Sequence, residues 1–132
     1  MIDNYDDIQA PFRTKLLSVV QQSEVAWENK DYEPTQGQIF IKEDLMHGSE
    51  DPSATNEVSQ TGIMQYSVLT PIGSGTKDVK KKADEIKHAF KPGTILSNKV
   101  YCNSASVVNG QNANGWYSKL VQIAYTLYAP NS

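Results

Sequence analysis

The chain has 132 residues, which suits one domain, and its 39% of hydrophobic residues is typical of a globular protein. Twelve basic residues against fifteen acidic ones give a net charge of −3, so general electrostatic binding to nucleic acid is not indicated. The single cysteine, Cys102, excludes an internal disulfide bond and a cysteine-based zinc site. The sequence also lacks a membrane-spanning run and the pattern of a signal peptide. We therefore expect one domain over residues 1–132.

Two amphipathic helices are predicted. The first covers residues 4–22, and its apolar stripe consists of Ile8, Phe12, Leu16 and Val19. Proline is tolerated only in the first turn of a helix, so this helix is expected to start near Asp7 or to bend at Pro11. The second helix is expected to begin after Thr76, which can cap it, and to stop at Pro92-Gly93. Its buried stripe consists of Val79, Ala83, Ile86 and Phe90.

The remaining segments alternate between apolar and polar residues, as β-strands do. The predicted strands cover residues 25–28, 38–42, 63–70, 100–108 and 119–128. A loop rich in asparagine and glycine at residues 109–115 predicts a hairpin between the last two strands. This order predicts an α+β fold, a single mostly antiparallel β-sheet with two α-helices packed on one face.

Residues 43–59 are expected to form a long irregular and exposed loop, because they contain the breakers Gly48 and Pro52. A loop of this length in a compact domain is usually functional or disordered. The segment has no Lys or Arg, and its five acidic residues are Glu43, Asp44, Glu50, Asp51 and Glu57. These residues are candidates for contact with a partner.

The solvent face of the second helix is the complementary candidate. It lies about 180° from Val79 by the helical period and also carries His88. Its lysines are Lys77, Lys80, Lys81 and Lys87. One interpretation is an ordinary solvated face, and the other is a contact stripe for an acidic partner.

Residues 72–77, with the sequence IGSGTK, lie between a strand and a helix, where phosphate-binding loops occur. A Walker-type loop needs Gly-Lys followed by Ser or Thr, but the order here is Gly-Thr-Lys. A dinucleotide-binding motif would need glycine where Asp78 stands. We interpret Pro71, Gly73 and Gly75 as structural turn formers. A small nucleotide- or phosphate-binding enzyme that uses the turn at 73–77 is the alternative from another functional class.

Other chemistry has less support. Cys102 lies in a predicted strand, where a lone cysteine is usually a small core residue, and no nucleophile motif surrounds a serine. His47 and Asp44 could form part of a cation-dependent binding module, but they lack a recognised ligand spacing. We therefore assign no catalytic or metal-binding residue and no cofactor.

Several short motifs follow one another along the chain. They are VAWEN at 25–29, Tyr32-x-Pro34, GIMQYSV at 62–68, PIGSG at 71–75, Trp116-Tyr117 and VQIAY at 121–125. In this order, and after an amphipathic first helix, they resemble the tail terminator proteins of long-tailed bacteriophages. The resemblance covers nearly the whole chain.

The resemblance implies a non-enzymatic α+β protein that forms a hexameric ring, caps the tail tube, stops tube growth and offers a surface for head attachment. The implied partners are further copies of the chain, the major tail tube protein and a head-completion or connector protein. No membrane is implied, and nucleic acid is implied only as DNA passing through the ring. The implied location is the virion tail or neck, after assembly in the bacterial cytoplasm. Another neck or head-completion protein is the nearby alternative.

A ring needs two different complementary patches on each subunit. The acidic segment and the lysine face could supply them, because opposite charges would set the register of neighbouring subunits.

Overall fold

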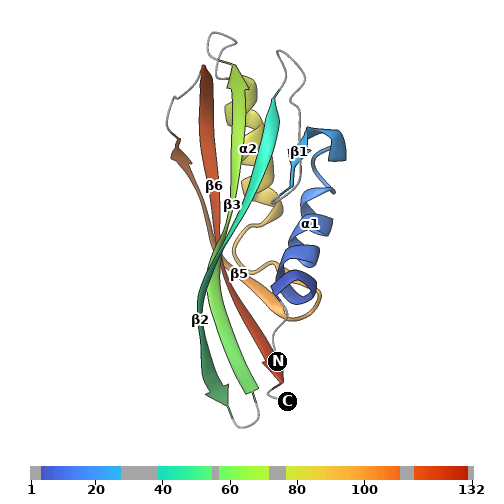
Figure 1. The fold of residues 1–132 in the computed structure, drawn as a ribbon, viewed down its shortest axis with the longest axis vertical. Coiled ribbons are helices and arrows are strands. Elements are labelled where there is room, and N and C mark those ends of the chain that lie inside the picture. The colour runs from blue at the N-terminus through green and yellow to red at the C-terminus, as the bar shows by residue number, and fades with distance from the viewer. Residues whose placement is uncertain (1–3, 28–38, 55–56, 72–76, 111–114, 131–132) are drawn as a thin grey trace.

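The computed structural model describes residues 4–27, 39–54, 57–71, 77–110 and 115–130. Within these ranges, residues 4, 47–54, 57–58 and 129–130 are described by their backbone alone. The described strands form one mixed sheet in the order β1-β2-β3-β6-β5-β4. The sheet is strongly twisted and elongated, and α1 and α2 lie beside its upper part in the view of Figure 1.

The elements follow each other along the chain as short helices, strands and one longer helix. They are η1 (Asn4–Gln9), α1 (Ala10–Leu16), η2 (Gln22–Glu24), β1 (Val25–Ala26), β2 (Phe40–Ala54), β3 (Glu57–Pro71), α2 (Lys77–Ala89), β4 (Ile95–Leu96), β5 (Val100–Asn109) and β6 (Trp116–Pro130).

The first helical segment is shorter than predicted. A π-helical turn, η1, precedes α1, and Pro11 lies within the first turn of α1, where its missing N–H is not needed. The expected continuation to residue 22 is wrong, because the chain turns after Leu16 and becomes extended at Gln21. There Gln21 and Glu24 form a capping box that starts the separate 3₁₀ turn η2.

The predicted irregular loop over residues 43–59 is wrong, because most of it belongs to strands. β2 and β3 pair antiparallel from Phe40↔Leu69 to Ala54↔Glu57. The pairing tolerates Gly48 and Pro52 because the register shifts between His47 and Glu50 and again between Pro52 and Ala54. Such irregularities are where a strand accommodates glycine and proline.

β3 is the centre of the sheet and is paired on both sides. β6 pairs antiparallel with β3 over the whole length of that strand, from Glu57↔Pro130 to Pro71↔Trp116. The strands β2, β3 and β6 continue beyond the helices toward the lower end of Figure 1. The described pairings are antiparallel except for β1 with β2, so the sheet is mixed. The predicted hairpin of the last two strands is confirmed by the β5–β6 pairing.

Both helices contact the same set of core side chains through an aromatic cluster. The ring centroid of Phe12 on α1 lies 5.3 Å from that of Phe90, just after α2, and 5.7 Å from that of Tyr125 on β6. The Phe90 ring lies 5.8 Å from Tyr66 on β3. The stripe predicted for the second helix is confirmed, because its four residues are fully buried: Val79, Ala83, Ile86 and Phe90.

We expect Gly62→Ala to lower the free energy of unfolding by about 1–3 kcal/mol, as overpacked substitutions do. A Cβ atom at Gly62 would lie 2.5 Å from Tyr125 Oη and 2.6 Å from the backbone carbonyl oxygen of Met46. The tyrosine ring is buried and the carbonyl belongs to β2, so neither atom moves freely. Urea denaturation measures the change, with Thr61→Ala, at an exposed neighbour, as the control. Equal stability of the two variants would contradict the expectation.

Candidate interaction surfaces

The five acidic residues of the predicted loop do not share one environment. Asp44 is exposed on β2, as predicted. Glu43 is only 2% exposed, so the prediction that Glu43 is exposed is wrong. The physical reason is strand alternation, which places Glu43 on the inner face between Ile41 and Leu45. The other three acids lie in strands whose side chains are outside the described part: Glu50, Asp51 and Glu57.

Glu43 is held by an arginine from the first helix. The Arg13 guanidinium donates to the Glu43 carboxylate through Nη2 to Oε1 at 2.7 Å and through Nε to Oε2 at 3.0 Å. The same guanidinium lies 4.9 Å from the ring centroid of Trp27 and 5.3 Å from that of Tyr5. The hydrogen bond to Glu43 raises the pKa of Arg13. This bidentate pair joins α1 to β2, which is a structural role rather than a free acidic contact.

A second ion pair ties the N-terminal segment to the turn before β5. Lys99 Nζ lies 2.6 Å from Asp7 Oδ1, and the Lys99 side chain is 40% exposed. Exposed pairs of this kind contribute about 1 kcal/mol or less. The Arg13–Glu43 pair differs in that its carboxylate has no exposed surface, so removing its arginine partner would leave a buried charge uncompensated.

The predicted lysine face exists, and its four residues are exposed on α2: Lys77, Lys80, Lys81 and Lys87. Part of this face borders a groove of about 650 Å³ against the turn after α1, lined by Val19, Lys81, Asp84, Glu85 and His88. A smaller hollow of about 280 Å³ continues past His88 to Lys91 and Pro92. The lysine face of α2 therefore also carries acidic residues, Asp84 and Glu85. That this face contacts a partner stays a prediction.

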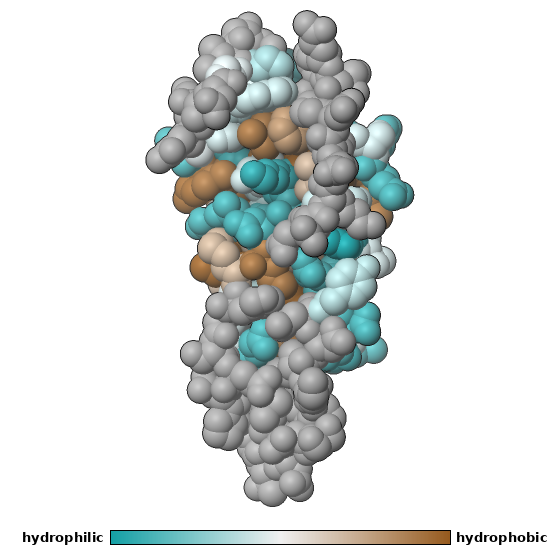
Figure 2. Space-filling view, viewed as in Figure 1, coloured by the Kyte–Doolittle hydropathy of each residue, from teal (hydrophilic) through white to brown (hydrophobic). Residues whose placement is uncertain are grey.

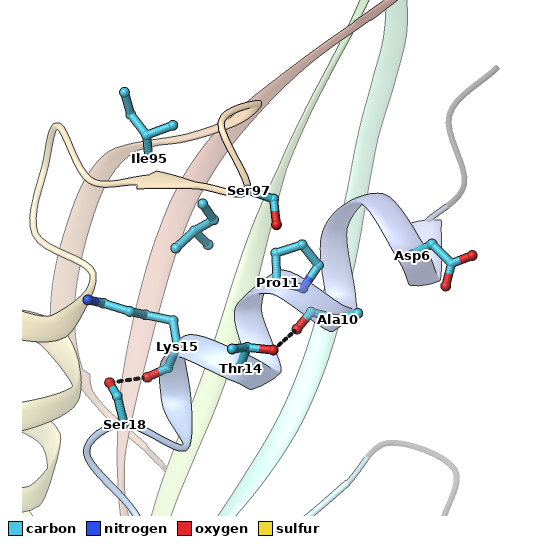
Figure 3. Close-up of a pocket in the computed structure, with 9 residues that line it drawn as sticks. Asp6, Ala10, Pro11, Thr14, Lys15, Ser18, Ile95 and Ser97 are labelled. Carbon is cyan, nitrogen blue, oxygen red and sulfur yellow. Dashed lines mark hydrogen bonds between the residues drawn. The ribbon is translucent and has the colours of Figure 1, made fainter.

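A third groove, of about 450 Å³, lies between α1 and the β4 turn (Figure 3). Two of its hydroxyl groups are turned to the backbone of the helix: Thr14 Oγ1 donates to the carbonyl oxygen of Ala10 at 3.0 Å, and Ser18 Oγ donates to that of Lys15 at 2.5 Å. Ile95 forms part of the opposite wall and is largely exposed.

The outer face of the sheet, away from the helices, is a mixture of apolar and polar side chains. On the side of the molecule seen in Figure 2, hydrophobic side chains form small patches separated by hydrophilic ones. Met46 of β2 and Ile63 of β3 are cross-strand partners and are 39% and 36% exposed. Small separate patches of this kind are normal on a protein surface.

The structure places some of the residues that the chemical alternatives use, whereas residues 72–76 of the glycine-rich turn and the side chain of His47 lie outside its described part. Cys102 is buried on the inner face of β5, as expected of a core residue. Among the described residues, no group of three or more His, Cys, Asp or Glu side chains is placed to bind a metal ion. Of the turn formers, Pro71 ends β3, while Gly73 and Gly75 lie outside the described residues. None of the described helices is both long and apolar enough to span a membrane.

We expect Cys102 to resist alkylation in the folded protein. Burial raises the pKa of its thiol to about 11, so the reactive thiolate is scarce at pH 8. Mass spectrometry after treatment with iodoacetamide at that pH should show unmodified protein, and full modification once urea unfolds the chain. Rapid alkylation of the folded protein would contradict the assignment of Cys102 to the core.

Comparisons with known proteins agree with this architecture. Residues 7–125 match the family model described as phage tail terminator protein. One solved structure, identified only by a sequence code, is similar with a TM-score of 0.66 and 17% identity, over 90% of this chain and 94% of that chain. A chain from the virion of a native gene transfer agent particle is similar with a TM-score of 0.58 and 15% identity, over 98% and 99%. A search of curated proteins gave no match.

Proposed function

Because the chain belongs to the phage tail terminator protein family, we propose that its copies form a hexameric ring that caps the finished tail tube. Membership of this family makes the protein a structural component of the virion tail. The ring stops the addition of tube subunits and offers the surface to which the head attaches. The observation that carries this proposal is the family match over residues 7–125, which includes both helices and the whole of the central strand β3.

The partners in this proposal are further copies of the chain, the major tail tube protein and a head-completion or connector protein. A ring requires two different patches that complement each other. In this proposal the first patch is the lysine face of α2, and the second is the acidic segment of β2 from Asp44 to Asp51. Their opposite charges support a head-to-tail contact between neighbouring subunits.

The proposed mechanism is docking without bond chemistry. Burial raises the pKa of the Cys102 thiol to about 11, so the thiol is protonated at neutral pH, and the hydroxyls of Thr14 and Ser18 in the α1 groove are bonded to the helix backbone. The contacts that terminate the tube are therefore assigned to surface shape and charge.

Loss of the protein is expected to give tails that are over-long or lack heads. The gene would be inactivated in the phage that encodes this protein, and tail length and head attachment would be measured by negative-stain electron microscopy. Tails of normal length without heads would instead support a neck or head-completion role. Normal virions would refute both.

The charge patches can be tested in the same system by complementation. Lys80→Glu combined with Lys81→Glu reverses charge on α2 and is expected to restore normal tails poorly. The matched control is Lys42→Glu, which reverses an exposed lysine on β2 outside the lysine face. Equal rescue by all of these variants would remove the lysine face from the proposed ring contact.

A further inference from the structure

The outer edge of β5 is open over Asn103–Asn109 in the part of the chain that the structure describes. β4 pairs only with Val100 and Tyr101. Two further backbone hydrogen bonds follow at Cys102: its N–H donates to the carbonyl oxygen of Thr94 at 2.8 Å, and its carbonyl oxygen accepts from the Gly93 N–H at 2.9 Å. Beyond that point, no described strand lies on this side of β5.

Hydrogen bonds at the two ends of β5 determine which backbone groups face this edge. The Cys102 N–H points away from β6, toward Thr94, whereas the Gly110 N–H points to β6 and donates to the carbonyl oxygen of Ser118 at 3.1 Å. Between them the register shifts once, at Cys102/Ser104, and backbone groups then alternate as in any antiparallel strand. The residues whose N–H and C=O face outward are therefore Ala105, Val107 and Asn109.

After the register shift at Cys102/Ser104, this edge lacks the features that normally prevent pairing with another chain. Natural edge strands carry charges, proline or bulges. Asn103–Asn109 reads NSASVVN, with no charge, proline or glycine, and its register is regular after Ser104. Val108 adds a side chain that is 39% exposed. By contrast, β2 contains acidic residues, Pro52 and two register shifts.

We propose that this edge pairs antiparallel with the same edge of a second copy of the chain, around a two-fold axis through Val107. Val107 then lies opposite Val107 of the second copy, and Ala105 lies opposite its Asn109. Each such pair exchanges two backbone hydrogen bonds. When a strand pairs with its own copy, each residue lies opposite a residue of the same sequence, so charged residues would face like charges. β5 contains no charged residue, and a second copy of the chain is therefore a suitable partner.

The pairing is independent of the proposed tail function. A two-fold contact does not occur between subunits within a ring of purely cyclic symmetry. The proposed dimer is therefore a state of the free protein. Its two copies must separate before they enter such a ring.

Sedimentation velocity over a wide range of protein concentration tests the pairing. The wild-type protein is expected to be dimeric when concentrated and to dissociate on dilution. Ala105→Pro removes an outward N–H but no bond to β6, so it is expected to stay monomeric with a nearly unchanged melting temperature. Ala105→Val keeps the N–H and should dimerise like the wild type. A wild-type protein that is monomeric at every concentration would overturn the proposal.

Disulfide cross-linking tests the register and does not depend on how well the proline variant folds. Ser106 would lie opposite Val108 of the second copy at a non-hydrogen-bonded position, where Cα atoms are about 4.5 Å apart, within disulfide range. An oxidised mixture of Ser106→Cys and Val108→Cys proteins should therefore form mixed dimers. Each variant alone should not, because like positions are about 7–8 Å apart. Wild-type protein, with Cys102 buried, is the control. No mixed dimer, or equal linking of each variant with itself, would overturn the proposed register.

Discussion

Replacing Arg13 with methionine is expected to lower the free energy of unfolding by about 3–5 kcal/mol, the usual effect of breaking a buried ion pair. The variant leaves the Glu43 carboxylate, which has no exposed surface, without its bidentate partner. It also removes the cation that lies against the rings of Tyr5 and Trp27. Urea denaturation followed by far-ultraviolet circular dichroism measures the loss.

The double variant Arg13→Met with Glu43→Met distinguishes the effect of an unpaired buried carboxylate from the effect of losing the other contacts of Arg13. Apolar side chains of similar volume often replace a buried pair without loss, so the double variant is expected to recover most of the lost stability. Lys80→Met, on the exposed face of α2, is the matched control and should change stability by less than about 0.5 kcal/mol. A double variant as unstable as Arg13→Met alone would contradict the assignment of the loss to the stranded charge.

Phe90→Ala is expected to lower the free energy of unfolding by about 3–5 kcal/mol, the typical cost of removing a buried phenylalanine ring. Phe90 is fully buried and contacts rings from α1 and β3, at 5.3 Å from Phe12 and 5.8 Å from Tyr66. Its loss opens a cavity where both helices meet the sheet. The measurement is again urea denaturation.

Phe90→Leu keeps most of the apolar volume and should cost clearly less than Phe90→Ala. Equal effects of the two substitutions would show that the loss does not come from the cavity. A small effect of both would show that the aromatic cluster does not hold the helices on the sheet.

The parts of the fold that the sequence predicted correctly are those with a strong local period. The four apolar residues of the second helix recur at helical spacing, and all four are buried. In β6, alternation separates buried Val121, Ile123 and Tyr125 from the half-buried residues between them. In these segments the local pattern and the tertiary burial agree, so no distant contact is needed to interpret them.

The parts that were missed depend on contacts far along the chain. Gly48 and Pro52 predict a loop when β2 is considered alone, but pairing with β3 holds both residues within a strand. Glu43 illustrates the same limit. Alternation with Ile41 and Leu45 indicates that Glu43 points inward, but a carboxylate is buried only when a partner compensates its charge. That partner, Arg13, lies thirty residues away in sequence, so the local pattern does not reveal it. The parallel β1–β2 pair has no local signal either.

The central position of β3 determines how the domain responds to force. This strand is paired with β2 on one side from Glu57 to Leu69 and with β6 on the other from Glu57 to Pro71. A pull along the strands loads all of these bonds together in shear, whereas a pull across the sheet separates them one at a time like a zipper. The domain should therefore be mechanically stiff along its long axis and comparatively weak at right angles to it.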